Sequence, residues 1–178
     1  MPTSRAGTSS SGIRASRGFT LMELLAVIAL LALAAAIVLP RLTVSTTREL
    51  NRSARQLAAT IRYVQDRAIT GKTPHRMRLE PGTGTVRITR VHSDGSEGAP
   101  GESFLERPVL ADGVTVTDVS TPRGGKAASG EAVLRFDMAG LGDFTIIHLK
   151  GESDAAMTVM AYPSGKVTVA EGYAEEPQ

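Results

Sequence analysis

Glu23 is a carboxylate inside a long apolar segment, where a charge needs a partner. It is the single charged residue between Phe19 and Leu39. Such a carboxylate costs roughly 2.5–3.5 kcal/mol at the centre of a bilayer. No basic residue lies three or four positions away to pair with it along a helix. A cut after Gly18 would create an amine on Phe19, four residues before Glu23, and this amine, from the same chain or a neighbouring one, would supply the missing charge.

Two simpler interpretations of the N-terminal region compete with this one. Residues 1–18 carry three arginines and no acid, and Ala34–Ala36 has the small residues at which an ordinary secretory signal is cleaved. That cleavage would release residues 37–178. The second alternative is a plain single-span anchor. Neither gains anything from a carboxylate in the apolar segment, so Glu23 argues against both.

Other residues with chemical potential form no catalytic or metal-binding pattern. His75, His92 and His148 are isolated, and the chain has no cysteine, so the spacing of a zinc site is missing. Ser164–Lys166 lacks the leading glycine of a phosphate-binding loop, and Val167 follows the lysine. We therefore expect no enzyme activity, no cofactor and no metal.

The segment that contains Asp94, Gly95 and Glu97 has oxygen ligands of the kind that calcium prefers. It lacks the ligand series of an EF-hand loop, so the pattern predicts a polar turn.

The elements that position Glu23 begin with a helix of membrane-spanning length. Phe19 to Leu39 is 21 residues, and an α-helix of that length extends about 31 Å, close to the thickness of the hydrocarbon core. Pro40 follows, and we expect it to kink or loosen the helix where the apolar segment ends.

A second helical pattern covers residues 41–71. Its apolar side chains recur every three or four positions and predict one stripe packed on the rest of the protein, formed by Leu50, Ala54, Leu57, Ile61, Val64 and Ala68. Five arginines lie largely off that stripe, as on a solvated face or one that contacts acidic neighbours: Arg48, Arg52, Arg55, Arg62 and Arg67. Gly71 is a suitable terminator.

The charges are distributed unevenly along the chain. Residues 41–72 carry seven basic and two acidic residues, whereas residues 73–178 carry ten basic and fifteen acidic residues. The first segment therefore has a net charge of +5 and the second a net charge of −5, although the whole chain is only +2. A basic stem supports an acidic head.

In residues 73–178, apolar and polar side chains alternate with a period of two, which predicts strands of an antiparallel β-sheet. With the N-terminal helix, this makes the fold class α+β. Apolar alternation on both sides of a turn at 81–84 predicts a β-hairpin. Residues 92–103 are typical of an exposed loop, and glycine-rich turns are expected at 121–130 and 140–143. Further strands are expected near 104–110, 114–119, 132–136, 144–149, 157–162 and 166–169.

The N-terminal pattern resembles a type IV prepilin or type II secretion pseudopilin. The resemblance rests on a basic leader, Gly18, Phe19-Thr20-Leu21, Glu23, an apolar run and Pro40. It implies cleavage after Gly18 by prepilin peptidase and N-methylation of Phe19. It also implies that Glu23 pairs with the Phe19 amine of an adjacent subunit during assembly.

The resemblance implies four regions. They are a cleaved leader (1–18), a transmembrane helix (19–40), an amphipathic stem helix (41–71) and a β-rich periplasmic head (73–178). The expected location is the bacterial inner membrane, crossed once, with the C-terminal head in the periplasm. Arginines flank both ends of the apolar run, so the positive-inside rule does not choose this orientation, and the family resemblance does.

The head is similar to the GspH/FimT group of pilin-like proteins. The similarity rests on the order of an early hairpin, Leu110–Val114, Phe136 with Gly140, and Tyr162–Val167. It resembles the minor pseudopilin H of type II secretion, which implies a structural subunit near the tip of the pseudopilus that assists export of folded proteins. The implied partners are other pseudopilins, prepilin peptidase and the inner-membrane assembly platform.

A type IV minor pilin of the FimT type, active in pilus assembly or DNA uptake, is the alternative function. DNA affinity comes mainly from Lys and Arg that neutralise phosphates, and DNA-binding relatives of this kind use a basic C-terminal region. Residues 171–178 contain three acids and no base, so secretion is favoured and nucleic-acid binding is not expected.

Overall fold

The computed structural model describes residues 20–152 and 154–175, without the side chains of residues 37–46. The leader (1–18) and Phe19 therefore lie outside the described residues. The chain divides into two compact units, residues 1–39 and residues 40–178, and each is considered by itself. The first helix, α1 (Leu21–Thr70), begins in the first unit and ends in the second.

The first unit presents apolar side chains on all sides of its helix. Leu21 and Met22 expose 82% and 80% of their surface, and seven further large apolar residues up to Leu33 are also exposed. Within the part of the chain that the structure describes, no helix combines the length and hydropathy of a membrane span.

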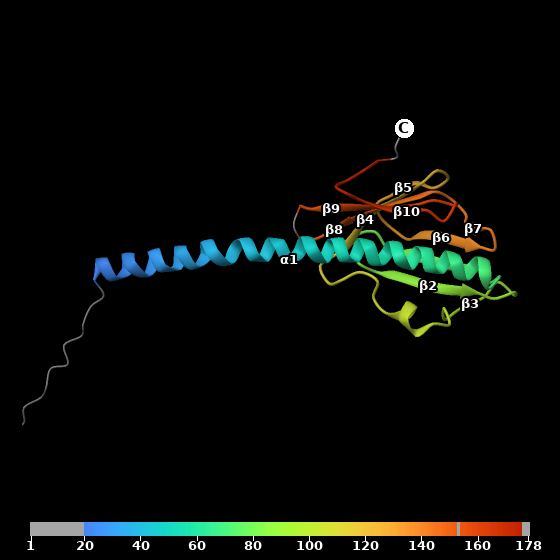
Figure 1. The fold of residues 1–178 in the computed structure, drawn as a ribbon, viewed down its shortest axis with the longest axis horizontal. Helices are drawn as coiled ribbons and strands as arrows, with labels where there is room; N and C mark the ends of the chain where they lie inside the picture. The colour runs from blue at the N-terminus through green and yellow to red at the C-terminus, as the bar shows by residue number, and fades with distance from the viewer. Residues whose placement is uncertain (1–19, 153, 176–178) are drawn as a thin grey trace, which may run out of the picture. The chain divides into compact units, whose positions relative to one another are not determined.

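The second unit buries the predicted stripe of α1 completely. Its six residues retain at most 1% of their accessible surface: Leu50, Ala54, Leu57, Ile61, Val64 and Ala68. They share one hydrophobic core with residues of both sheets, whose strands gather around this part of the helix (Figure 1). The prediction of an amphipathic helix packed on its own head is confirmed.

Two antiparallel sheets, rather than one, pack on this helix. The first sheet has the strand order β3-β2-β1-β6-β7, and the second has β10-β9-β8-β4-β5. The strands are β1 (His75–Leu79), β2 (Val86–Val91), β3 (Glu97–Gly98), β4 (Thr115–Thr121), β5 (Gly125–Ala127), β6 (Ala132–Asp137), β7 (Gly140–Leu141), β8 (Thr145–Lys150), β9 (Ala156–Ala161) and β10 (Val167–Glu171). The predicted hairpin is present as β1–β2, with Met77 opposite Ile88.

The predicted strand near 104–110 is wrong. A short 3-10 helix, η1 (Ser103–Glu106), begins this segment, and Leu105, Val109 and Leu110 are buried. These three apolar residues are spaced by four and by one, which does not fit the period of two that a strand requires. Pro108 also lacks the N–H that a central strand would donate.

Polar side chains of α1 fix both ends of its contact with the head. Ser53 Oγ accepts a hydrogen bond from the Ala111 N–H at 3.0 Å, and Gln65 Nε2 donates to the Pro163 carbonyl at 3.0 Å. Gly140 allows the second contact, because a Cβ there would lie 2.8 Å from Gln65 Nε2 and its φ is +108°. The helix is thus fixed along its axis as well as by its apolar stripe.

The helix ends at Thr70, as the glycine at position 71 indicated. Glycine is needed at position 71 for space rather than for a left-handed backbone. A Cβ on Gly71 would lie 2.7 Å from the Arg67 carbonyl oxygen, whereas the left-handed conformation belongs to Lys72, with φ of 48°.

Candidate assembly site

Glu23 lies in the first turn of α1, three residues after the residue that caps the helix. Its backbone N–H lies within hydrogen-bond distance of the Thr20 carbonyl at 3.1 Å and of Thr20 Oγ1 at 3.2 Å. A threonine followed three positions later by glutamate is the pattern of a capping box, and a carboxylate in the first turn interacts favourably with the helix dipole. This local role of Thr20 was readable in the sequence and was missed.

The Glu23 carboxylate is exposed, and no described cation lies within ion-pair distance of it. Gly18 and Phe19, which complete the predicted processing site, lie outside the described residues. Pro40 lies within the bounds of α1 at the border of the two units, and its kink stays a prediction. The pairing of Glu23 with a Phe19 amine likewise stays a prediction.

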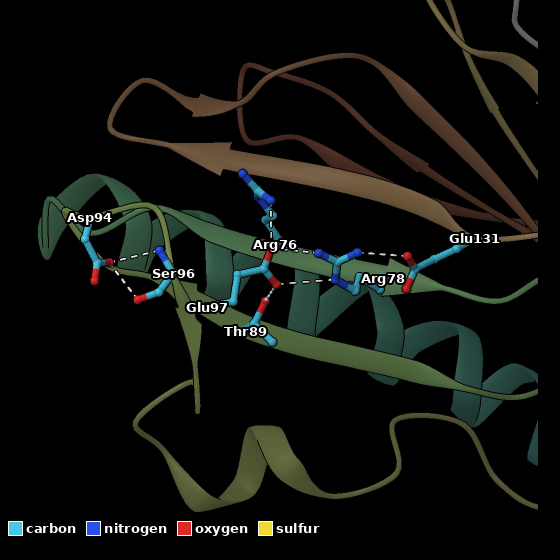
Figure 2. A network of polar contacts seen from close by, with 7 residues as sticks. All are labelled: Arg76, Arg78, Thr89, Asp94, Ser96, Glu97 and Glu131. Carbon is cyan, nitrogen blue, oxygen red and sulfur yellow. Dashed lines mark hydrogen bonds and ion pairs between the residues drawn. The ribbon is translucent and has the colours of Figure 1, made fainter.

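In the head, Glu97 on β3 binds side chains of two neighbouring strands at once (Figure 2). Its Oε1 accepts from Arg76 Nη1 and Arg78 Nη2, each at 2.7 Å, and its Oε2 accepts from Thr89 Oγ1 at 2.7 Å. Arg78 Nη1 also donates to Glu131 at 2.8 Å. The hydrogen bond from Arg78 is the main reason that the pKa of Glu97 falls to about 2. The network ties the two-residue strand β3 to the rest of its sheet.

Asp94 and Glu97, the calcium candidates, use their carboxylates for different contacts. Asp94 Oδ1 accepts from the Ser96 N–H at 2.9 Å and from Ser96 Oγ at 2.6 Å, within a turn in which Gly95 has φ of 84°. Glu97 faces the arginines instead (Figure 2). Over the described ranges, no group of three or more His, Asp or Glu side chains is arranged to hold a metal ion. The polar turn is present.

Asp118 and His148 form a buried hydrogen-bonded pair that sequence spacing did not reveal. They lie opposite each other on β4 and β8, 2.8 Å apart, and their side chains expose only 2% and 4% of their surface. Asp118 Oδ2 accepts from the Tyr173 hydroxyl at 2.8 Å, and the Tyr173 ring stacks on His148 with 3.5 Å between centroids. Lys126 Nζ lies 3.8 Å from Asp118.

Both ring nitrogens of His148 contact oxygen acceptors. Nδ1 faces Asp118, and Nε2 lies 3.0 Å from the Ala174 carbonyl. Both ring nitrogens are therefore engaged by groups of the same chain. Thr158 also binds the tail, donating to Gly172 and accepting from Ala174, so the cluster fastens residues 172–174 to the second sheet.

Comparison with known proteins bears on the N-terminal region and on the fold. Residues 13–39 match the prokaryotic N-terminal methylation motif. The fold is similar to that of the minor pseudopilin EpsH from the type 2 secretion system of Vibrio cholerae, with a TM-score of 0.52, 15% identity, and coverage of 69% of this chain and 97% of that chain. For the type IV minor pilin FimU of Pseudomonas aeruginosa, the TM-score is 0.49, with 17% identity over 70% of this chain and 90% of that chain. No curated protein matches the chain in sequence.

These findings confirm the resemblance inferred from the residues. The motif match includes Gly18, Phe19 and Glu23, and the likeness to EpsH shows a pilin-like α+β fold. The chain is type IV pilin-like in its N-terminal motif and in its fold.

We expect Glu97→Gln to destabilise the head at neutral pH and to flatten its response to acid. The pKa of Glu97 is depressed in the folded state to about 2. Its stabilising contribution is therefore present above the ordinary carboxyl pKa and is lost as the pH falls toward the folded value. Urea midpoints measured between about pH 5 and about pH 2 should converge for the two proteins at the acid end. Glu106→Gln, an exposed carboxylate on η1, is the control. Parallel pH curves for wild type and Glu97→Gln would contradict the assignment.

Tyr173→Phe should lower the free energy of unfolding by about 1–2 kcal/mol, because buried Asp118 loses an O–H donor. Burial is the main cause that raises the pKa of Tyr173, so its hydroxyl carries its proton at neutral pH. Tyr162→Phe is the matched control, since its hydroxyl lies 3.9 Å from Met160 Sδ, and we expect a change below about 0.5 kcal/mol. Equal losses for the two variants in urea unfolding would show that Tyr173 does not hold the tail through Asp118.

Proposed function

We propose that this chain is a minor structural subunit of a pseudopilus, a pilus-like filament of a type II secretion system that assists export of folded proteins. The proposal rests on two features that occur together in one chain. A methylation motif over residues 13–39 places a carboxylate in an apolar helix, and the same chain has a pilin-like head. The secretion role belongs to EpsH by its name and is extended to this chain as a hypothesis.

The apolar helix supports a role as a membrane anchor. A helix that is hydrophobic on every side requires a protein core or a membrane around it. Between Leu21 and Leu33 the large apolar side chains remain exposed, so the described residues provide no such core. We infer that residues 19–40 cross the inner membrane once before assembly, with residues 73–178 on the periplasmic side.

The pairing of Glu23 gives the anchor a role in assembly. Cleavage by prepilin peptidase after Gly18 would leave a free amine on Phe19, and subsequent N-methylation would keep its positive charge. In a low-dielectric environment, an unpaired charge costs several kcal/mol. A neighbouring subunit docked so that its Phe19 amine meets Glu23 removes the cost for both groups. The pair would thereby set the axial position of one subunit relative to the next.

Secretion is proposed over DNA uptake because of the charge on the head. Residues 73–178 carry a net charge of −5, and Glu171 and Glu175 lie in the C-terminal region where DNA-binding relatives are basic. Phosphate binding would require the opposite sign. The proposed partners are other pseudopilins and the inner-membrane assembly platform.

A non-enzymatic role is consistent with the state of the polar clusters in the head. Glu97 is occupied by Arg76, Arg78 and Thr89, and both nitrogens of His148 are bonded. Each cluster joins strands or fastens the tail, which is what a structural subunit requires.

Glu23→Leu should leave membrane insertion and processing intact but impair entry into the filament. Loss of the carboxylate removes a membrane penalty of at most roughly 2.5–3.5 kcal/mol, the value for the bilayer centre, so the isolated subunit should insert at least as well. The neighbouring Phe19 amine, however, loses its counter-charge. Crosslinking to other pseudopilins, in cells where the variant is inserted and cleaved, measures the defect. Glu23→Asp keeps the charge, and Met22→Leu changes an adjacent apolar residue; both should crosslink better than Glu23→Leu. Wild-type crosslinking and export by Glu23→Leu would remove Glu23 from the assembly mechanism.

A further inference from the structure

A groove separates α1 from the edge strand β10 in the second unit. It has a volume of about 460 Å³, and its walls are Asn51, Arg55 and Arg62 on one side and Met157, Val169 and Glu171 on the other. Its lining therefore combines apolar side chains with two cations and one anion. None of the clusters described above uses it.

β10 presents free backbone groups toward this groove. Where β10 pairs with β9, the Tyr162 N–H donates to the Lys166 carbonyl and the Gly172 N–H donates to the Ala156 carbonyl. With the register of the two strands, these bonds show that the even-numbered residues of β10 are the ones hydrogen-bonded to β9. The N–H and C=O groups of Val167, Val169 and Glu171 consequently point away from β9. Arg62 already donates to the Val167 carbonyl, whereas no hydrogen bond of the described chain occupies the outward groups of Val169.

The two arginines of the groove belong to a basic stripe on α1. Arg48, Arg52, Arg55 and Arg62 are spaced by four, three and seven residues, which places them on one helical face opposite the buried stripe. All four are exposed, and none has a carboxylate within ion-pair distance in the part of the chain that the structure covers. Arg55 instead donates to Asn51 at 2.7 Å.

The partner that these features fit is a peptide rather than a nucleic acid. The Val169 carbonyl can accept from a peptide N–H, whereas a phosphate backbone carries no N–H donor. An extended segment can add as a strand to a free edge, with its backbone giving affinity and its side chains giving specificity. Carboxylates on that segment would meet Arg55 and Arg62, which are seven residues apart, or about 10 Å along the helix.

We propose that the groove between α1 and β10 is a docking site for an extended acidic segment of a neighbouring filament subunit, which pairs with β10 and neutralises the arginine stripe. The proposal rests on the filament function proposed above, because that function brings a second subunit alongside the stem. It explains why β10 combines a free edge with unpaired cations.

Binding of a fluorescent decapeptide of alternating Thr and Glu to the full chain in detergent micelles tests the site. We expect the anisotropy to rise saturably, and Arg55→Gln to weaken binding about threefold, the range for an exposed ion pair. Arg87→Gln, an exposed arginine on β2, should leave the affinity unchanged. Val169→Pro should abolish binding without unfolding the head, because a proline whose missing N–H points outward is tolerated on an edge strand.

Three results would overturn the proposal. One is equal binding of the peptide by wild type, Arg55→Gln and Val169→Pro. Another is equal affinity for a peptide in which Gln replaces Glu. The third is displacement of the peptide by a DNA oligonucleotide whose own binding requires Arg55, because the stripe would then be a phosphate site. The assay needs no filament, so a negative result here leaves the filament function to the Glu23 crosslinking experiment.

Discussion

The way in which apolar surface is covered along α1 is the constraint on which the rest of the structure depends. From Leu50 to Ala68 the helix buries one stripe under its own two sheets, and that burial creates the core of the head. From Leu21 to Leu33 the large apolar side chains are exposed, so their burial requires something outside the described residues. The fold buries the apolar surface of one half of the helix and leaves that of the other half to be covered by its surroundings. This arrangement suits a subunit that is anchored first and assembled afterwards.

The charged groups divide in a similar way, into those paired within the chain and those that are not. In the head, Glu97 has Arg76 and Arg78 at 2.7 Å, and Asp118 has His148 at 2.8 Å; these contacts fasten an edge strand and the tail. Glu23 and the stripe from Arg48 to Arg62 have no such ion pair among the described residues. The internal pairs stabilise the unit, whereas the unpaired groups are of opposite sign, and in the proposed filament neighbouring subunits would supply their partners.

Local periodicity was sufficient to predict the buried stripe of α1, the β1–β2 hairpin and the turn at Asp94, because each depends on residues close in sequence. The division into two sheets was not predicted, since pairing between strands is a long-range choice. The short strands β3, β5 and β7 lie in glycine-rich segments predicted as loops or turns. Asp118 and His148 are 30 residues apart and meet only through the register of β4 and β8, so no local pattern indicated their pairing. At the assembly site, Thr20 was the signal that was overlooked.

The most direct test of the central claim is the intact mass of the protein purified from cells with prepilin peptidase and from cells without it. The account predicts a chain that begins at methylated Phe19 in the first case and an uncleaved leader in the second. A mature chain beginning at Ile37 in both would establish an ordinary secretory signal, remove the Phe19 amine and Glu23 from the protein, and contradict the filament function.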